Sequence, residues 1–222
     1  ESTFANYPHI AAKIVNLFAK KFSVKSPASA KTLEKLGLEI YAELENVANL
    51  DDDRIIRLYV DMIVATLRTN YFQKDGEGKF KSYISLKIQP SLIPEVPLPV
   101  PAFEIFVYSP RVEGVHLRFG KVARGGLRWS DRREDFRTEV LGLVKAQQVK
   151  NTVIVPVGSK GGFVCKQLPS EREAFIKEGQ ECYKIFIRGL LDITDNIERG
   201  EVVPAVDVTR HDEDDAYLVV AA

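Results

Sequence analysis

The sequence predicts an α/β fold, in which a mixed sheet flanked by helices follows an N-terminal helical segment. Apolar residues recur every three or four positions through the first quarter of the chain, which is the period of an amphipathic helix. From residue 80 onward, short runs alternate in polarity or are rich in β-branched and aromatic residues, as strands are. We therefore expect a helical segment over residues 1–75 and an α/β domain over residues 76–222.

Composition narrows the class of protein. The chain has 222 residues, of which 45% are hydrophobic, and its 31 Lys and Arg balance its 31 Asp and Glu. This balance gives no electrostatic reason to expect binding to nucleic acid or to an anionic membrane. Neither a membrane-spanning run nor a signal-peptide pattern is present. The two cysteines are unclustered, so we expect a cytoplasmic protein without a disulfide scaffold or a metal site.

Three helices are expected in the N-terminal segment. The third begins after Asp51, Asp52 and Asp53, whose charges suit a helix N-terminus better than a metal site with no other ligands nearby. The apolar residues assigned to the three stripes are Ile10, Ile14, Leu17 and Phe18, then Leu33, Leu36, Ile40 and Leu44, then Ile56, Leu58, Val60, Ile63 and Leu67.

Strands are expected at residues 80–88, 103–108 and 114–119, where polarity alternates or β-formers gather. Five of the eleven prolines fall within residues 90–101, which predicts an extended connector rather than a helix or central strand. A proline-rich ligand for a partner protein is the alternative. His116 and Arg118 alternate with apolar neighbours, so one strand face should be polar, with His116 either functional or on the surface.

The chain is organised around residues 124–162, where two glycine pairs each follow a cation. Between the pairs, Phe136, Val140, Leu143, Gln147 and Lys150 share one face of a predicted helix. The helix should begin near a capping box formed by Asp131 and Glu134. We expect it to bury its first half and to direct Gln147 and Lys150 into a cleft. The alternative is that Lys150 only caps the helix and Gln147 is a partly exposed polar residue.

Residues 152–157 are apolar and rich in β-branched side chains, which predicts a buried strand. Pro156 should end this strand. The following Gly158–Gly162 predicts a turn that presents Lys160 at the carboxyl end of this strand, where open α/β sheets bind ligands. A lysine held beside other cations can act as a base near neutral pH. An exposed turn lysine is the alternative, since the order of residues differs from that of a phosphate-binding loop.

These motifs carry a resemblance to a known family. KVARGGLRWS, LVKAQQVKN and VGSKGG, followed by Pro204–Asp207, occur in the order found in the substrate domain of glutamate dehydrogenases. The segment HLRFGKVARGGLRWSDRREDFRTEVLGLVKAQQVKN resembles in particular the large NAD-specific bacterial type. The likeness covers about the last 140 residues.

The resemblance implies roles for individual residues. Lys160 would be the catalytic lysine and Asp207 the catalytic carboxylate. Lys150 and Gln147 would hold the α-carboxylate of the substrate. Arg124 stands where the smaller members of the family have a lysine for the distal carboxylate. Gly125 and Gly126 would let the substrate lie against the backbone.

The resemblance also implies partners. L-glutamate and 2-oxoglutarate would be the substrates, in an NAD-dependent oxidative deamination by an enzyme that is a homo-oligomer at full length. No GxGxxG motif followed by a helix and an acidic residue occurs. We therefore expect NAD to be bound mainly by a domain outside this chain, which would be a fragment of a larger enzyme. Two alternatives are a dehydrogenase of a monocarboxylic amino acid such as leucine or phenylalanine, and a non-catalytic regulatory or assembly domain.

Overall fold

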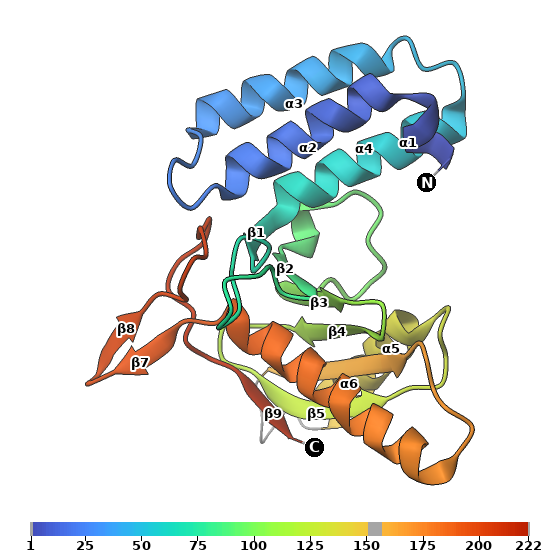
Figure 1. The fold of residues 1–222 in the computed structure, drawn as a ribbon, viewed down its shortest axis with the longest axis vertical. Coiled ribbons are helices and arrows are strands. Elements are labelled where there is room, and N and C mark those ends of the chain that lie inside the picture. The colour runs from blue at the N-terminus through green and yellow to red at the C-terminus, as the bar shows by residue number, and fades with distance from the viewer. Residues whose placement is uncertain (1, 151–156, 222) are drawn as a thin grey trace.

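A computed structural model describes residues 2–150 and 157–221 of the chain (Figure 1). Three long helices pack together at one end, and a mixed sheet with a helix on each face forms the rest. The helices are α1 (Ser2–Asn6), α2 (Pro8–Phe22), α3 (Ala30–Leu44), α4 (Leu50–Ala65), α5 (Phe136–Lys150) and α6 (Arg172–Asp192), with a 3-10 turn, η1 (Pro90–Leu92). The strands are β1 (Thr66–Thr69), β2 (Ile84–Ile88), β3 (Phe103–Tyr108), β4 (Val112–Arg118), β5 (Arg124–Trp129), β6 (Ser159–Cys165), β7 (Asn196–Glu198), β8 (Glu201–Val203) and β9 (Val219–Ala221).

The three predicted N-terminal helices are confirmed. Ile10, Leu17, Ile40 and Ile56 belong to one buried cluster between α2, α3 and α4, because residues three or four apart share a helix face. The side chain of Asn49 accepts hydrogen bonds from the first backbone N–H groups of α4, and three aspartates follow in the first turn. These aspartates thus mark a helix N-terminus, as expected.

Two residues of the third stripe lie elsewhere than predicted. Leu58 is 44% exposed and lines a groove between α4 and the proline-rich connector, because it falls between the buried positions Ile56 and Val60. Leu67 lies in β1, since the helix ends at Ala65. This end matters for the fold, because α4 leads directly into the first strand of the sheet.

The large sheet has the strand order β1-β2-β3-β4-β6-β5-β9. Neighbours from β1 to β6 are antiparallel, and β5 runs parallel to both β6 and β9. The sheet is therefore mixed, as the sequence predicts. β1 precedes residue 75 but pairs with β2 beyond it, and a domain boundary at residue 75 stays a prediction.

Each face of the sheet has its own helix (Figure 1). On one face, α5 buries Val140 and Val144 against Val115 and Leu117 of β4. On the other, α6 packs Phe186 and its neighbours against β3, β4 and β6. The two faces thus form separate apolar cores, which the alternation of side chains along β4 keeps apart.

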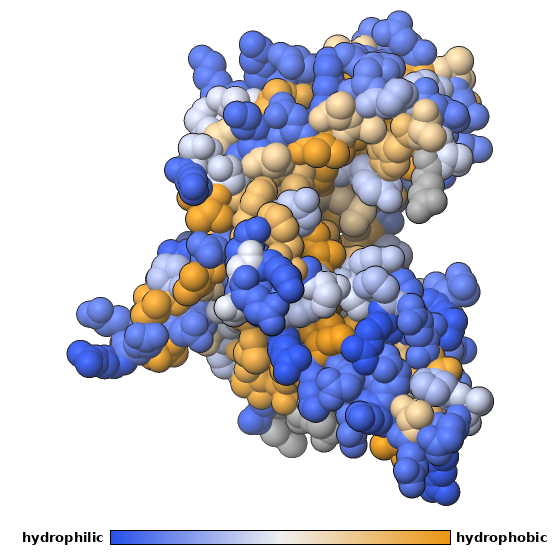
Figure 2. Space-filling view, viewed as in Figure 1, coloured by the Kyte–Doolittle hydropathy of each residue, from blue (hydrophilic) through white to orange (hydrophobic). Residues whose placement is uncertain are grey.

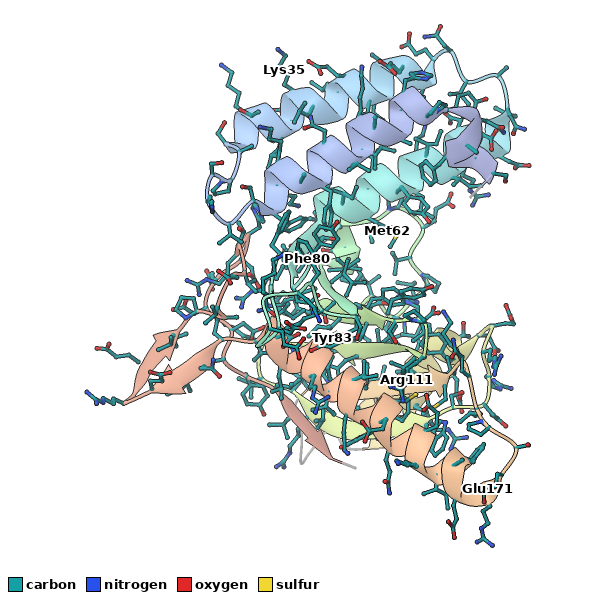
Figure 3. All side chains as sticks on the ribbon, in the orientation of Figure 1. Lys35, Met62, Phe80, Tyr83, Arg111 and Glu171 are labelled. Carbon is teal, nitrogen blue, oxygen red and sulfur yellow. The ribbon has the colours of Figure 1, made fainter. Side chains whose placement is uncertain are left out.

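Aromatic and ionic contacts attach α6 to the sheet. Trp129 stacks on Phe163 of β6 and Phe175 of α6 with ring centroids 6.1 and 5.3 Å apart. A Cβ at Gly179 would lie 2.2 Å from the Trp129 ring, so the helix can approach only because this residue is glycine. Arg111, beside α6 in Figure 3, forms an ion pair with Glu178 at 2.6 Å.

Several predicted boundaries differ from the structure. The strand expected from residue 80 begins only at Ile84, and Phe80 instead stacks on Tyr71. The proline-rich connector opens with the 3-10 turn η1. Likewise, α5 begins at Phe136 rather than beside the capping box expected at Asp131 and Glu134. Residues 152–156 of the expected buried strand lie outside the described residues.

The C-terminal region holds elements that the sequence patterns did not indicate. β7 and β8 form a hairpin whose turn residues Arg199 and Gly200 both have positive φ, as two-residue hairpin turns require. Figure 2 shows hydrophilic side chains at its tip. The chain then returns to the sheet as β9, which lies at its edge beside β5.

Among the described helices, none is both long and apolar enough to span a membrane. Cys165 and Cys182 are buried, unoxidised thiols. Within residues 2–150 and 157–221, no group of three or more His, Cys, Asp or Glu side chains could hold a metal ion.

Candidate active site

The two glycine pairs meet where β5 runs beside β6. Leu127 lies opposite Gly161, and Arg124 forms an isolated bridge with Gly158. Both contacts have the same offset in residue number between the two strands, and the same offset places Gly126 beside Lys160. Segments that are far apart in the sequence are thereby joined at one point of the sheet.

Close packing explains why three of these four positions are glycine. A Cβ at Gly125 would lie 1.6 Å from the backbone oxygen of Ser159. At Gly161 it would lie 2.4 Å from Leu127, and at Gly162 2.4 Å from Val140. Larger residues would therefore push the strands or α5 apart.

The predicted lysine turn is wrong, because Lys160 lies inside β6, one residue after its start. Its glycine neighbours fit a central strand between crowded partners, and neither has the positive φ that a tight turn requires. Lys160 is paired with Leu117 of β4. Directly paired residues point to the same face, so the Lys160 side chain lies on the α5 face of the sheet.

Arg124 lies on the same face. Two residues further along β5, Arg128 forms an ion pair with Glu139 of α5 at 2.8 Å. Side chains two residues apart on a strand share a face, so Arg124 points to the α5 side too. Arg124 is exposed and Lys160 is partly buried.

Gln147 connects α5 to this point of the sheet. Its Nε2 donates a hydrogen bond to the Arg124 carbonyl oxygen at 3.3 Å. Its Oε1 is buried without a hydrogen-bond partner among the described residues, and a Cβ at Gly158 would lie 2.8 Å from it. Gln147 is partly exposed, as in the alternative expectation, and its predicted direction into a cleft stays a prediction.

The predicted apolar stripe of α5 needs one correction. Leu143 is 38% exposed, while Leu141 and Val144 are buried with Phe136 and Val140. The buried face of α5 therefore keeps Phe136 and Val140 but extends toward Leu141 and Val144 rather than Leu143. Lys150 is its last residue, and the direction of its side chain lies outside what the structure describes.

The positive charges of Arg124 and Lys160 have no neighbouring carboxylate among the described residues. Within the described part of the chain, neither Arg124 nor Lys160 lies within 4.0 Å of a carboxylate, whereas Arg128 on the same strand does. An arginine can bind a carboxylate through two parallel hydrogen bonds. This corner of the sheet can therefore receive an anionic group from a ligand.

Asp207 lies in the loop between β8 and β9 and is exposed. Its φ of 54° is left-handed, which is uncommon outside glycine and recurs at functional sites. No hydrogen bond or ion pair in the described residues joins Asp207 to Lys160 or Arg124. The loop does lead to β9, where Val219 pairs with Arg124.

The opposite face of the sheet holds a second group of cations beyond the end of α6. Arg68, Lys87 and Arg118 come from β1, β2 and β4, and all three are at most 4% exposed. They bind three aspartates of the C-terminal region at 2.5–3.2 Å, namely Asp195, Asp212 and Asp215. We call these six residues the buried ion network.

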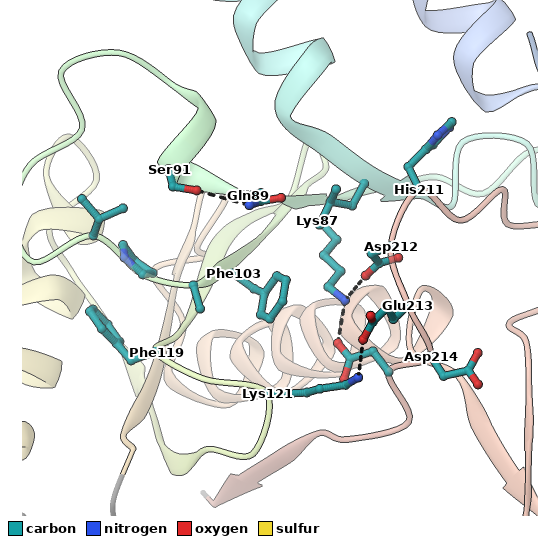
Figure 4. Close-up of a pocket in the computed structure, with 15 residues that line it drawn as sticks. Lys87, Gln89, Ser91, Phe103, Phe119, Lys121, His211, Asp212, Glu213 and Asp214 are labelled. Atoms are coloured by element: carbon teal, nitrogen blue, oxygen red, sulfur yellow. Dashed lines mark hydrogen bonds and ion pairs between the residues drawn. The ribbon is translucent and has the colours of Figure 1, made fainter. Parts of the chain in front are cut away.

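The buried ion network keeps Asp195 and Asp215 charged. Burial alone would raise the pKa of Asp215, but hydrogen bonds from Arg118 and Lys87 outweigh it and hold the pKa below its ordinary value. Figure 4 shows Lys87 between its acidic partners. The network borders a cavity of about 740 Å³ that Phe103, Phe119 and Lys121 also line.

Sequence patterns did not indicate this network. Two features of the sequence could have pointed to it, namely the acidic run from residue 212 to 215 and the basic residues that alternate along the strands. The predicted polar face of β4 is confirmed by Arg118 and His116. His116 is only 2% exposed, which excludes the surface position. Burial, and then the Arg118 charge, lower its pKa to about 4.

Comparison with known proteins identifies the family of the chain. Residues 39–222 match the family model described as "Bacterial NAD-glutamate dehydrogenase, catalytic domain". Proteins named NAD-specific glutamate dehydrogenase are 63% identical over 96% of the chain in Pseudomonas aeruginosa and 58% identical over all of it in Halomonas elongata. One from Mycobacterium tuberculosis is 52% identical over all of the chain.

The chain spans about 14% of the length of each of these relatives. The family match nevertheless covers far more than half of the chain and includes the glycine pairs, α5, β6 and the Asp207 loop. The chain therefore belongs to the family of bacterial NAD-glutamate dehydrogenase catalytic domains.

Proposed function

We propose that this chain is the substrate-binding part of an NAD-dependent glutamate dehydrogenase, which converts L-glutamate to 2-oxoglutarate and ammonium. The observation that carries the proposal is the pair of cations without acidic partners in the described chain, Arg124 and Lys160, on adjoining strands of the sheet. A dicarboxylate substrate needs more than one cation at its site. The relatives are named for this enzyme.

Each site residue receives a role in this proposal. Arg124 binds the distal carboxylate of the substrate, and Lys150 with Gln147 binds the α-carboxylate. The Nε2 group of Gln147 carries two N–H donors, of which one is given to the Arg124 carbonyl oxygen, and the other can be donated to the α-carboxylate. Gly126, two residues from Arg124 on the same face of β5, leaves the backbone open to the substrate, whereas the space beside Gly125 is filled by the backbone of Ser159.

Lys160 and Asp207 carry the proton transfers. After the α-carbon has been oxidised to an iminium, Lys160 assists a water molecule in attacking that carbon. Asp207 moves protons to and from the nitrogen as ammonium leaves. Cations around the site stabilise the negative charge of the substrate and of the developing product.

NAD binding is assigned to the remainder of the full-length protein. A dinucleotide-binding loop has its glycines at a turn between a strand and a helix. Here Gly125–Gly126 and Gly161–Gly162 lie inside strands, so the described residues do not fit that role. We also propose a cytoplasmic, homo-oligomeric full-length enzyme, whose subunit number native mass spectrometry would measure.

The substrate preference of the full-length protein tests the proposal. NAD reduction should occur with L-glutamate and be far slower with L-leucine or L-phenylalanine, because neither has a second carboxylate for Arg124. Preference for leucine or phenylalanine would establish the monocarboxylic alternative. Absence of turnover with all three, in protein that contains every domain, would support a regulatory or assembly role.

A further inference from the structure

The loop that carries Asp207 is held by the N-terminal part of the chain. Thr209 donates hydrogen bonds to the carbonyl oxygens of Phe22 and Ser23 at the end of α2, at 3.2 and 3.1 Å. The backbone N–H of His211 donates to the carbonyl of Leu67 in β1 at 3.0 Å. The N-terminal segment therefore supports a loop that lies far from it in sequence.

Gln73 makes the contact nearest to Asp207. This residue follows β1 and is 7% exposed. Its Nε2 donates to the carbonyl oxygen of Val206 at 2.7 Å and to that of Asp192, at the end of α6, at 2.9 Å. Its Oε1 accepts a hydrogen bond from Lys81 at 2.7 Å. Both ends of the amide are thus engaged, which fixes its orientation.

The Val206 carbonyl belongs to the peptide group that joins Val206 to Asp207. The orientation of this peptide plane sets φ of Asp207, which is 54°. A left-handed φ is unfavourable for an L-residue, so the residue needs an external contact to keep it. One residue earlier, the backbone N–H of Ala205 is held by Asp195 at 3.2 Å.

A change of φ would redirect the Asp207 side chain. Side-chain direction follows from the backbone at Cα, and Asp207 is exposed, so no packing of its own holds it in place. Val206 is 75% exposed as well. Among the described residues, the hydrogen bond from Gln73 is the side-chain contact on the peptide group that precedes Asp207.

We propose that Gln73 is a positioning residue for the carboxylate of Asp207, acting through the peptide group between Val206 and Asp207. The inference rests on the role proposed above for Asp207. It also gives the N-terminal segment a function in the reaction, since Gln73 follows directly from α4 and β1.

Two variants of the full-length enzyme test the inference. Gln73→Met removes both donors with little change in size, and Gln73→Glu keeps the shape and the Lys81 contact but turns an oxygen toward the Val206 carbonyl. In each we expect kcat to fall at least about tenfold, because small displacements of a reacting group have large effects on rate. The KM for glutamate should change less than about twofold, since Arg124 and Gln147 are untouched.

Gln167→Met is the matched control. Gln167 also donates its amide N–H to a backbone carbonyl, that of Pro110 at 3.1 Å, on an exposed loop. Its loss should leave kcat and KM unchanged. If Gln73→Met does not fold, Gln73→Glu supplies the same comparison.

A double-variant cycle with Asp207→Asn separates positioning from a general structural role. If Gln73 acts through Asp207, kcat of the Gln73→Met, Asp207→Asn double variant should equal that of Asp207→Asn alone. A double variant whose loss of kcat is the product of the two single losses would overturn the inference. Normal kcat in both Gln73 variants, while Asp207→Asn is inactive, would overturn it too. Full activity of Asp207→Asn would instead refute the role of Asp207 itself, and the inference with it.

Discussion

Two groups of cations on the same sheet differ in what surrounds them. Arg68, Lys87 and Arg118 are buried on the α6 face, and each is hydrogen-bonded to aspartates of the chain. Arg124 and Lys160 lie on the α5 face without an acidic partner among the described residues. A buried charge needs a partner to be tolerated, whereas a partly exposed one can remain available. The first group therefore serves the fold, and the second can serve a ligand.

The largest expected effect comes from removing a cation of the second group. Lys160→Met in the full-length enzyme should lower kcat by about 10²–10⁴-fold, the usual contribution of a proton-transferring group. Its free energy of unfolding should change little, because the side chain has no ion pair in the described structure. Lys121→Met, which removes an exposed lysine paired with Glu213, is the control. Equal turnover of the two variants would contradict the account.

Removing a cation of the first group should instead affect stability. Arg68→Met leaves the buried Asp195 and the partly buried Asp212 beside a missing charge, which typically costs about 3–5 kcal/mol of unfolding free energy. Urea unfolding of the 222-residue chain would measure this loss. A cost below about 1 kcal/mol, as for a surface pair, would show that the network does not stabilise the fold.

The buried His116 should make stability depend on pH. Its pKa is about 4 in the folded chain, against 6.5 for an unperturbed histidine such as that of the unfolded chain. Between these two pH values the unfolded chain therefore binds a proton that the folded chain does not. Stability should therefore fall as pH decreases through this window. One such group accounts for about 2 kcal/mol between pH 7 and pH 5.

Urea unfolding of the chain and its His116→Leu variant at these two pH values would measure the difference. The variant should lose less stability than the unmodified chain. An identical loss in both would mean that other groups cause the dependence. Asp195 and Asp215, whose pKa values are held below the ordinary carboxyl range despite burial, lose their stabilising charge only at more acidic pH.

The smallest effect is expected from a pair that belongs to neither group. Arg54 and Glu95 form an ion pair at 3.1 Å, but their side chains are 80% and 81% exposed. Arg54→Ala should therefore cost less than about 1 kcal/mol. Urea unfolding beside Arg68→Met gives the contrast directly, and similar losses would remove the distinction between buried and exposed pairs.

Local patterns predicted the elements whose residues contact near neighbours. The stripes of α2 and α3 and the strand β3 follow from the period of their apolar residues. Boundaries were less accurate. Phe80 is apolar in a strand-like pattern but stacks on Tyr71 outside β2, and Lys160 looks like a turn residue between glycines although β6 begins before it.

Long-range pairing could not be predicted from such patterns. Arg118 and Asp215 are 97 residues apart in sequence, and nothing in the local sequence of either identifies the other. The approach of Gly125 to Ser159 likewise depends on how β5 and β6 align. The order of motifs indicated the site residues, but only the fold shows that Arg124, Gln147 and Lys160 lie around the same strand ends. Their chemical roles stay proposals.

Arg124 and Arg128 offer the most direct test of the central claim, because they share a strand and a face but only Arg128 is paired, with Glu139. Isothermal titration of the full-length protein with 2-oxoglutarate would compare Arg124→Leu with Arg128→Leu. Losing a charged hydrogen bond to the ligand should weaken binding about 10- to 100-fold in Arg124→Leu, and Arg128→Leu should bind nearly as the unmodified protein does. Equal affinities in the two variants would contradict the claim that the unpaired cation binds the substrate.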